Sequence, residues 1–370
     1  MKAPRLLLHG YYGFGNAGDE ALLYALLKDL REEAPEAELK VLSGNPEHTR
    51  RSFGVPAVDR FHPLEVIRAL RWADLYILGG GTLLQDVTSL RSLHYYAGVL
   101  LLARLLGTPS MLYANGLGPI ETAWGRWITR HILRLPHLIT LRDHQSLDFM
   151  EGLKVRRPAL VTADAALGLT LSLTPEEEER RLKAFGLEPE SYALLALRPP
   201  ARGKSLPPAL VELIATIARE EPYEPIFLPF HPRLDQPLAE DLLRQVKPRG
   251  RILQVEAADT PSFLLLLKRA GLILTMRLHA LIMSAAVGRG ALAVVYDPKV
   301  EGVAEDLGLP TLGKLEELPP MPELWAHYLA LKEEISRREE ALRRDLPDLR
   351  AKAKSNAQRA LELWKTLQAK

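Results

Sequence analysis

Short apolar runs alternate with longer amphipathic stretches along most of the chain. This alternation is typical of βα units that stack into a parallel sheet. In the first half it predicts helices over residues 19–33, 63–71 and 92–106, and a further helix that begins at Asp143. The strands predicted between them cover residues 5–9, 39–43, 74–78, 110–114 and 138–141.

The same pattern starts again after a break near residues 156–158. Thr174-Pro175-Glu176-Glu177 has the N-cap, first-turn proline and acidic first turn of a helix, and we expect a second domain to begin near it. Further strands are predicted at residues 193–197, 225–228, 252–254, 271–275 and 291–295, and helices at 207–219, 236–245, 261–268 and 279–287. We therefore expect one Rossmann-like domain at residues 1–168 and a second at 169–320.

The end of the sequence has a different character. From Glu323 it is dense in Glu, Arg, Lys, Ala and Leu, and only Asp345-Leu346-Pro347 interrupts it. We expect a helical tail at residues 321–370, made of two long helices that pack back across the domains. Two open α/β domains in series predict a ligand site in a cleft between them, beyond the carboxyl ends of the strands.

Composition narrows the possible functions. The 370 residues are 47% hydrophobic and 25% charged and include no cysteine, which excludes thiol catalysis, Cys-ligated zinc and a disulfide scaffold. Interspersed charges with a net value of +2 give no support for nucleic-acid binding. Neither a signal peptide nor a membrane span is evident, so we expect a cytoplasmic protein. The ten histidines show no metal-ligand spacing, and we expect no metal and no cofactor.

The first loop, Gly13-Phe14-Gly15-Asn16-Ala17-Gly18-Asp19, contains GxGxxG between a strand and a helix. A dinucleotide site is one reading, but Asp19 and Glu20 would repel a pyrophosphate at the helix N-terminus. A tight turn with Asp19 as the N-cap is a second reading. We favour a third, in which Gly15 and Asn16 face a substrate and donate hydrogen bonds to its oxygens.

Two more glycine loops follow strands of the first domain. Gly79-Gly80-Gly81-Thr82-Leu83-Leu84-Gln85-Asp86 allows a ligand to approach the backbone closely. Asn115-Gly116-Leu117-Gly118-Pro119 again combines glycine with an amide side chain. Each loop alone has an ordinary explanation as a turn, but the set of three favours a cradle for an anion or a sugar.

Cationic side chains also follow predicted strands. Any one of them is an ordinary surface cation, but together they suit a small anion with several charges, because carboxylates and phosphates favour arginine and helix N-termini. His231 and Asp235 are weaker candidates, and Asp235 is expected to be an N-cap. The cationic set is Arg142, Arg198, Arg277, His279 and Lys299.

These loops together resemble the polysaccharide pyruvyl transferase family, and most closely its bacterial branch that modifies a cell-wall polysaccharide. The resemblance covers about residues 5–310 and rests on seven stretches in order. They are residues 13–19, 73–86, 115–119, Leu141-Arg142-Asp143, Asp164-Ala165-Ala166, residues 277–282 and Tyr296-Asp297-Pro298-Lys299-Val300. One departure is Asp164-Ala165-Ala166, where the family has Asp-Pro-Ala.

The resemblance implies a fold like that of the GT-B glycosyltransferases. It also implies transfer of the pyruvyl unit of phosphoenolpyruvate to two hydroxyls of one sugar, which forms a cyclic ketal and releases phosphate. The implied donor-binding residues are Arg142, Arg198, Arg277 and Lys299, and His279 is the implied catalytic residue. The acceptor, a carbohydrate on a lipid carrier, would contact Gly15, Asn16, Asp19, Gly80, Gly81, Gln85, Asp86 and Asn115.

Two other functions remain open from sequence. A GT-B glycosyltransferase would bind a nucleotide sugar and needs a carboxylate for the ribose hydroxyls. Glu301 and Glu305 follow Lys299 and could be misread as that carboxylate. A non-catalytic sugar-binding protein would not need the cationic cluster with His279. The basic tail residues Lys352, Lys354, Arg359 and Lys365 form either a solvated helix face or a peripheral contact with a membrane surface.

Overall fold

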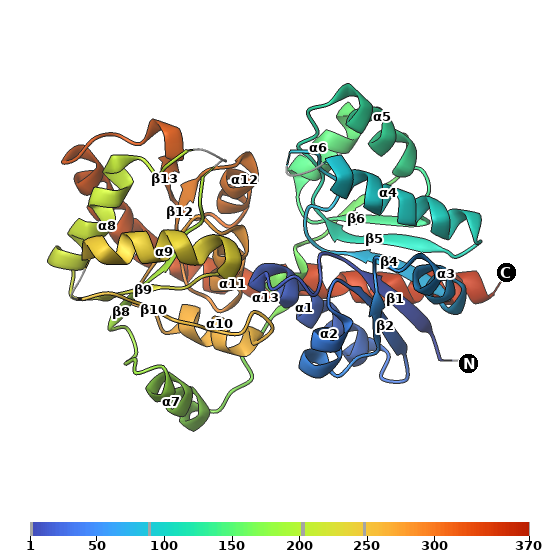
Figure 1. The fold of residues 1–370 in the computed structure, drawn as a ribbon, viewed down its shortest axis with the longest axis horizontal. Helices are drawn as coiled ribbons and strands as arrows, with labels where there is room; N and C mark the ends of the chain where they lie inside the picture. Colours follow the sequence, from blue (N-terminus) through green and yellow to red (C-terminus); the bar gives the residue numbers. More distant parts are fainter. Residues whose placement is uncertain (1–2, 88–89, 201–203, 247–248, 370) are drawn as a thin grey trace. The chain divides into compact units, whose positions relative to one another are not determined.

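The computed structural model describes residues 3–87, 90–200, 204–246 and 249–369. Two compact units make up the chain (Figure 1). Unit 1 contains Met1–Phe14, Asp19–Gly168 and Leu349–Lys370, and unit 2 contains Gly15–Gly18 and Leu169–Asp348. In the described part of the chain, no helix is both long enough and apolar enough to cross a bilayer.

Unit 1 is built on a seven-stranded parallel sheet with the order β3-β2-β1-β4-β5-β6-β7. The chain order reverses between β1 and β4, which is where open α/β sheets place their ligands. The strands are β1 (Arg5–His9), β2 (Glu38–Ser43), β3 (Ala57–Asp59), β4 (Leu75–Gly79), β5 (Ser110–Asn115), β6 (Leu138–Leu141) and β7 (Leu160–Val161).

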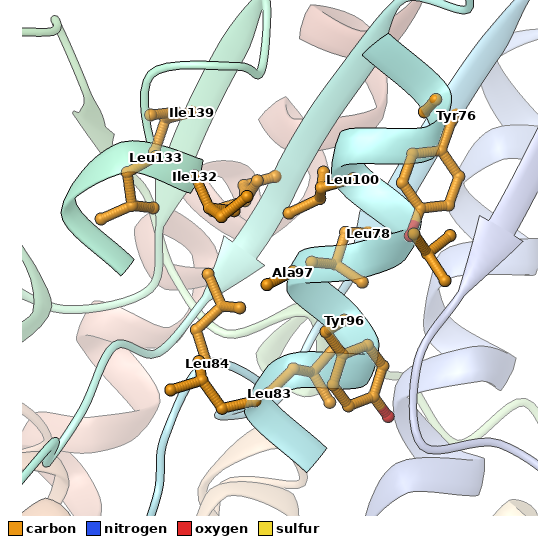
Figure 2. Packing of buried hydrophobic residues seen from close by; sticks show 14 of the residues in the cluster. Tyr76, Leu78, Leu83, Leu84, Tyr96, Ala97, Leu100, Ile132, Leu133 and Ile139 are labelled. Carbon is orange, nitrogen blue, oxygen red and sulfur yellow. The ribbon is translucent and has the colours of Figure 1, made fainter. Parts of the chain in front are cut away.

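Helices alternate with these strands. Their bounds are α1 (Ala17–Glu33), α2 (Pro46–Phe53), α3 (Pro63–Trp72), α4 (Leu90–Leu105), α5 (Ala123–Ile132) and α6 (His144–Gly152), with a 3₁₀ turn at Ala165–Gly168. One face of the sheet packs against α3 to α6 through a buried cluster that includes Tyr76 and Leu78 from β4 and Tyr96 and Leu100 from α4 (Figure 2). Strand residues on this face alternate with residues that point to the other face, as a pleated sheet requires.

Unit 2 has a six-stranded parallel sheet with the order β10-β9-β8-β11-β12-β13. The strands are β8 (Tyr192–Ala196), β9 (Glu224–Phe227), β10 (Arg251–Ile252), β11 (Leu272–Thr275), β12 (Leu292–Val295) and β13 (Thr311–Lys314). The helices are α7 (Pro175–Ala184), α8 (Pro208–Glu220), α9 (Pro232–Val246), α10 (Thr260–Lys268), α11 (Leu278–Ala286) and α12 (Pro298–Asp306), with a 3₁₀ turn at Leu315–Glu317. The N-cap predicted at Thr174 is present at the start of α7, and Thr174 and Glu177 also form a capping box.

The α/β class predicted from sequence is confirmed, because both units are parallel sheets with interleaved helices. Every predicted strand is present, with its ends shifted by at most two residues. The prediction of two helices in the tail is wrong, because α13 (Glu323–Gln368) is a single helix with Pro347 inside it. Leu342 and Leu346 before the proline and Ala353 after it are all buried, so packing continues through the site where local propensity favours a break.

The last part of α13 belongs to unit 1 and docks there through polar contacts. Asn356 is fully buried, accepts a hydrogen bond from Thr162 Oγ1 at 2.9 Å and donates to the Ala353 carbonyl at 2.8 Å. Lys354 forms an ion pair with Glu32 of α1 at 2.9 Å. Asp29, one turn earlier on α1, is 2% exposed, and its Oδ2 has no hydrogen-bond partner among the described residues.

Asp29 should make stability depend on pH. Burial raises the pKa of its carboxyl to about 7, although Lys354 acts in the opposite direction. The unfolded chain ionises this group near pH 4, so ionisation destabilises the fold as pH rises from about 4 to 7, and the full cost applies above pH 7. We expect Asp29→Asn to raise the free energy of unfolding at pH 8 by up to about 4 kcal/mol, and much less at pH 4.5. Urea unfolding at both pH values tests this, and an equal effect at both would contradict it.

Candidate functional site

The loop after β4 is anchored in the hydrophobic core of unit 1 by two leucines. Leu83 and Leu84 are 5% and 1% exposed and pack among residues of α4 and its neighbours (Figure 2). Leu84 also forms a parallel bridge with Leu117, and Gly116 N donates to the Gly81 carbonyl at 3.0 Å. The two glycine loops after β4 and β5 therefore lie side by side at the carboxyl edge of the sheet.

Several residues predicted to bind an acceptor come together in these loops. Gly80 and Gly81 have φ values of +56° and +74°, a region that favours glycine. A Cβ on Gly81 would lie 3.4 Å from Asp19 Oδ1, so the carboxylate of Asp19 lies beside this backbone. Asn115 Nδ2 donates to the Gly80 carbonyl at 3.4 Å, while its buried Oδ1 has no partner among the described residues. Asp19, Gly80, Gly81 and Asn115 thus lie together in one polar cluster.

Asp86 has a different environment from the rest of that set. Its carboxylate accepts hydrogen bonds from Glu121 N at 2.8 Å and Thr122 N at 3.0 Å. Burial alone would raise the pKa of Asp86, but these bonds and the Thr122 hydroxyl lower it. Asp86 therefore holds the segment that leads into α5, and Gln85 lies half-buried between it and the glycines.

Arg142 follows β6 and is almost completely buried, with its side chain 2% exposed. Its Nε donates to Asp143 at 3.0 Å, and its two terminal nitrogens donate to Asp164 at 3.3 Å and Thr82 Oγ1 at 3.2 Å. Burial would lower the pKa of Arg142, but Asp164 and Asp143 outweigh it and raise the pKa, which keeps the group charged. A Cβ on Gly116 would lie 2.9 Å from the guanidinium carbon, so only glycine fits against it. Arg142 joins three loop ends, and its contact with a donor stays a prediction.

Arg277 follows β11 in unit 2 and has a buried partner that sequence reasoning assigned to another role. Asp235, with a side chain 1% exposed, forms an ion pair with Arg277. The other oxygen of Asp235 accepts from Phe230 N at 3.1 Å and His231 N at 2.8 Å. The expectation that Asp235 is an N-cap is wrong, because α9 begins at Pro232 and Asp235 reaches back from inside the helix to the residues before it.

His279 lies at the start of α11, two residues after Arg277. Thr275 Oγ1 accepts from Arg277 N at 2.9 Å and shapes this turn. The segment Gly15–Gly18 clusters with unit 2, and a Cβ on Gly18 would lie 2.4 Å from His279 Nδ1. The third glycine of the GxGxxG sequence is thus required by the imidazole, which packs directly against its backbone.

The same segment forms the N-terminus of α1, where the sequence left the N-cap residue open. The helix begins at Ala17, so Asp19 is its third residue and the reading of Asp19 as the N-cap is wrong. Asn16 Oδ1 instead accepts from Gly18 N at 3.2 Å. Ala17 N donates to the Phe230 carbonyl at 2.7 Å, which joins this turn to the loop after β9. Burial, and then the charge of Arg277, lower the pKa of His231 in that loop.

Two further cations follow strands of the same sheet. Arg198 comes after β8, donates to Tyr296 OH at 2.8 Å and lies 4.4 Å from the centre of that ring. Lys299 comes after β12 and pairs with Asp297 at 3.1 Å. Since β8, β11 and β12 are adjacent, Arg198, Arg277 and Lys299 follow three neighbouring strands at one edge. Nowhere in the described ranges do three or more potential metal-ligating side chains group together.

Each unit is Rossmann-like, with a parallel sheet and interleaved helices, and the chain has the fold of the GT-B enzymes. The chain is similar to UDP-GlcNAc 2-epimerase from Neisseria meningitidis bound to UDP-GlcNAc, with a TM-score of 0.64 and 12% identity over 97% of this chain and 99% of that one. It is also similar to Anabaena Alr3699/HepE in complex with UDP-glucose, with a TM-score of 0.62 and 14% identity over 98% and 100% of the two chains. The corresponding values for a UDP-N-acetylglucosamine 2-epimerase from Rickettsia bellii are 0.61 and 14% over 97% and 96%.

The sequence identifies a family within this fold. Residues 16–298 match the model of the polysaccharide pyruvyl transferase family, and the chain belongs to that family. Gly15 and Lys299 lie just outside the matched range. No curated protein matches the sequence.

Some residues of the site were missed from sequence. The sequence predicts Asp143 as the start of a helix and as part of a family stretch, and Asp164 as part of another, yet both hold Arg142. Tyr296 belongs to a third family stretch, and its role as the aromatic partner of Arg198 is not evident from the sequence. Besides those family stretches, their positions at or soon after strand ends were an available signal, because residues at that edge gather in space.

The Asp235–Arg277 pair should contribute strongly to stability. Asp235→Asn leaves Arg277 poorly paired in a mostly buried place, and removing one partner of a buried ion pair costs about 3 kcal/mol or more. Asp241→Asn is the matched control, because Asp241 lies on the same helix and its pair with Arg244 is exposed; its cost should stay below about 1 kcal/mol. Urea unfolding of both variants measures the difference. Equal losses would show that the buried pair contributes no more than the exposed one.

Proposed function

We propose that this protein transfers the pyruvyl unit of phosphoenolpyruvate to two hydroxyls of one sugar in a lipid-linked cell-wall polysaccharide precursor. The product is a cyclic ketal, and phosphate is released. The proposal assigns the chain to the bacterial branch of its family that modifies a cell-wall polysaccharide, known as the CsaB type.

One observation carries the proposal. Arg277, held by the buried Asp235, lies two residues from His279 in the part of the chain that matches the family. A guanidinium oriented by a buried carboxylate loses little further entropy when it binds an anion. Arg198 and Lys299 follow the neighbouring strands, so three permanent cations are available for a donor that carries both a carboxylate and a phosphate.

The proposed chemistry uses these groups in order. A proton added to C3 of phosphoenolpyruvate gives C2 oxocarbenium character, and one sugar hydroxyl adds to C2 and loses its proton. The bond from C2 to the phosphate oxygen then breaks, and the neighbouring hydroxyl closes the ring with loss of a second proton, while phosphate takes up one. His279 is the side chain suited to these proton transfers near neutral pH. The cations stabilise charge on the carboxylate and on the departing phosphate.

The acceptor is assigned to the loops of unit 1. Asp19 beside Gly81, together with Asn115, supplies a carboxylate and an amide next to the glycine backbone. Sugar hydroxyls both donate and accept hydrogen bonds, so this mixture suits a carbohydrate better than an anion. Gln85 belongs to the same loop, and Asp86 supports it through the segment before α5. Contacts of Gly15 and Asn16 with an acceptor stay a prediction.

Calorimetric titration of the full chain with phosphoenolpyruvate tests the donor. We expect saturable binding that Arg277→Ala weakens about tenfold to a hundredfold, since hydrogen bonds to charged groups contribute roughly 1.5–3 kcal/mol. If Arg277→Ala is unstable, Arg277→Lys replaces it in the titration, because it keeps a positive charge near Asp235. Arg180→Ala, which removes an exposed arginine of α7, is the control. Binding of UDP-glucose or UDP-GlcNAc in place of phosphoenolpyruvate would instead assign the protein to the nucleotide-sugar glycosyltransferases.

His279 should be needed for turnover more than for donor binding. We expect His279→Ala to lower turnover by a factor of about 10² to 10⁴, with phosphoenolpyruvate still bound. Gly18→Ala should lower turnover too, because its Cβ would displace the imidazole. Gly98→Ala is the control, since a Cβ there meets open space on α4. The measurement is phosphate release with a panel of sugars on lipid pyrophosphate carriers, and near-normal rates for His279→Ala would remove this role.

A further inference from the structure

Unit 1 exposes two stacked tryptophans that the proposed reaction does not use. Trp124 and Trp127 lie on α5, with ring centres 4.9 Å apart and an interplanar angle of 8°. They are 55% and 53% exposed, and His131 continues the row with its ring 4.4 Å from Trp127. Large aromatic surfaces are seldom left in water without a partner.

The neighbouring helix extends this apolar surface. Trp124 Nε1 donates to His94 Nε2 of α4 at 3.1 Å. Both helices connect parallel strands and lie on the same side of β4, β5 and β6 (Figure 1), so they run in the same direction. Leu101 and His131 are each seven residues beyond this bonded pair and are therefore at the same level. Leu101 is 45% exposed, and Leu105, one turn further on, is 74% exposed.

The charged residues of this region are almost all positive. Between residues 90 and 142 Glu121 is the only acidic residue, although the whole chain is nearly neutral. Five arginines on or just after the two helices are exposed, and they are Arg91, Arg104, Arg126, Arg130 and Arg134. Exposed tryptophan and leucine flanked by arginine is the composition of helices that lie in the interface of an anionic bilayer.

We propose that the exposed faces of α4 and α5, here called the Trp–Arg face, bind the surface of an anionic membrane. The tryptophans and Leu105 would enter the headgroup region while the arginines contact lipid phosphates. Two copies of the face would repel each other through their arginines, which disfavours self-association. Leu101 and Leu105 would find an apolar partner in acyl chains and none along a nucleic-acid backbone.

The proposal goes beyond the proposed function and is tested without its substrates. The full-length protein is sedimented with vesicles of phosphatidylcholine alone and with vesicles that also contain phosphatidylglycerol. We expect binding to the anionic vesicles that falls as salt is added. Each arginine near such a surface strengthens binding roughly fivefold, so replacing Arg104, Arg130 and Arg134 together by Gln should weaken it about a hundredfold.

The tryptophans give a second readout that reports position. Brominated lipids should quench the fluorescence of the wild type, and Trp124→Phe with Trp127→Phe should lose most of that quenching. Leu234→Gln in unit 2, where the leucine is 51% exposed, is the matched control for removing a surface hydrophobe and should bind as the wild type does. Lys352→Gln with Lys365→Gln tests the basic side of α13 and should also leave binding unchanged.

Three outcomes would overturn the proposal. They are absence of binding to anionic vesicles, loss of binding in the α13 variant with the arginine variant unaffected, and a dimer in sedimentation velocity that only the tryptophan variant dissociates. Because phosphoenolpyruvate binding is measured separately, vesicle binding and the proposed reaction fail or succeed independently.

Discussion

In both units a buried carboxylate holds an arginine at the carboxyl edge of a parallel sheet. Asp164 and Asp143 hold Arg142 in unit 1, and Asp235 holds Arg277 in unit 2. An ion removed from water without a partner costs several kcal/mol, so these pairs dictate where the loops around them lie. The loop glycines follow from the same constraint, because Gly116 must leave room for the guanidinium of Arg142.

The two arginines differ in what remains available to a ligand. Arg142 has three polar partners and a side chain 2% exposed, so it stabilises the ends of the loops. Arg277 has a carboxylate on one side, and its side chain is 12% exposed. Arg142 is thus taken up by its partners within the protein, whereas Arg277 keeps more exposed surface, and this is why the donor proposal rests on unit 2.

Periodicity was sufficient to predict the strands, because a buried strand in a parallel sheet is apolar along its whole length. It missed α2, β3, α5, β7, α12 and β13, which are short or polar enough to resemble loops. The cations at the strand ends were predictable, since strand polarity alone brings them to one edge. Their partners were not, because the pairing of Asp235 with Arg277 spans 42 residues and depends on the order of the strands. Pro347 was read as a break because local propensity says nothing of the packing on either side of it.

The division of α13 between the units has a consequence for synthesis on the ribosome. Residues 349–370 complete unit 1, yet they are translated after all of unit 2. Until they emerge, Thr162 lacks the amide of Asn356, and the side of α1 that carries Glu32 lacks Lys354. Unit 1 is therefore translated first but completed last. While unit 2 is synthesised, nascent unit 1 has an uncovered surface that chaperones can bind.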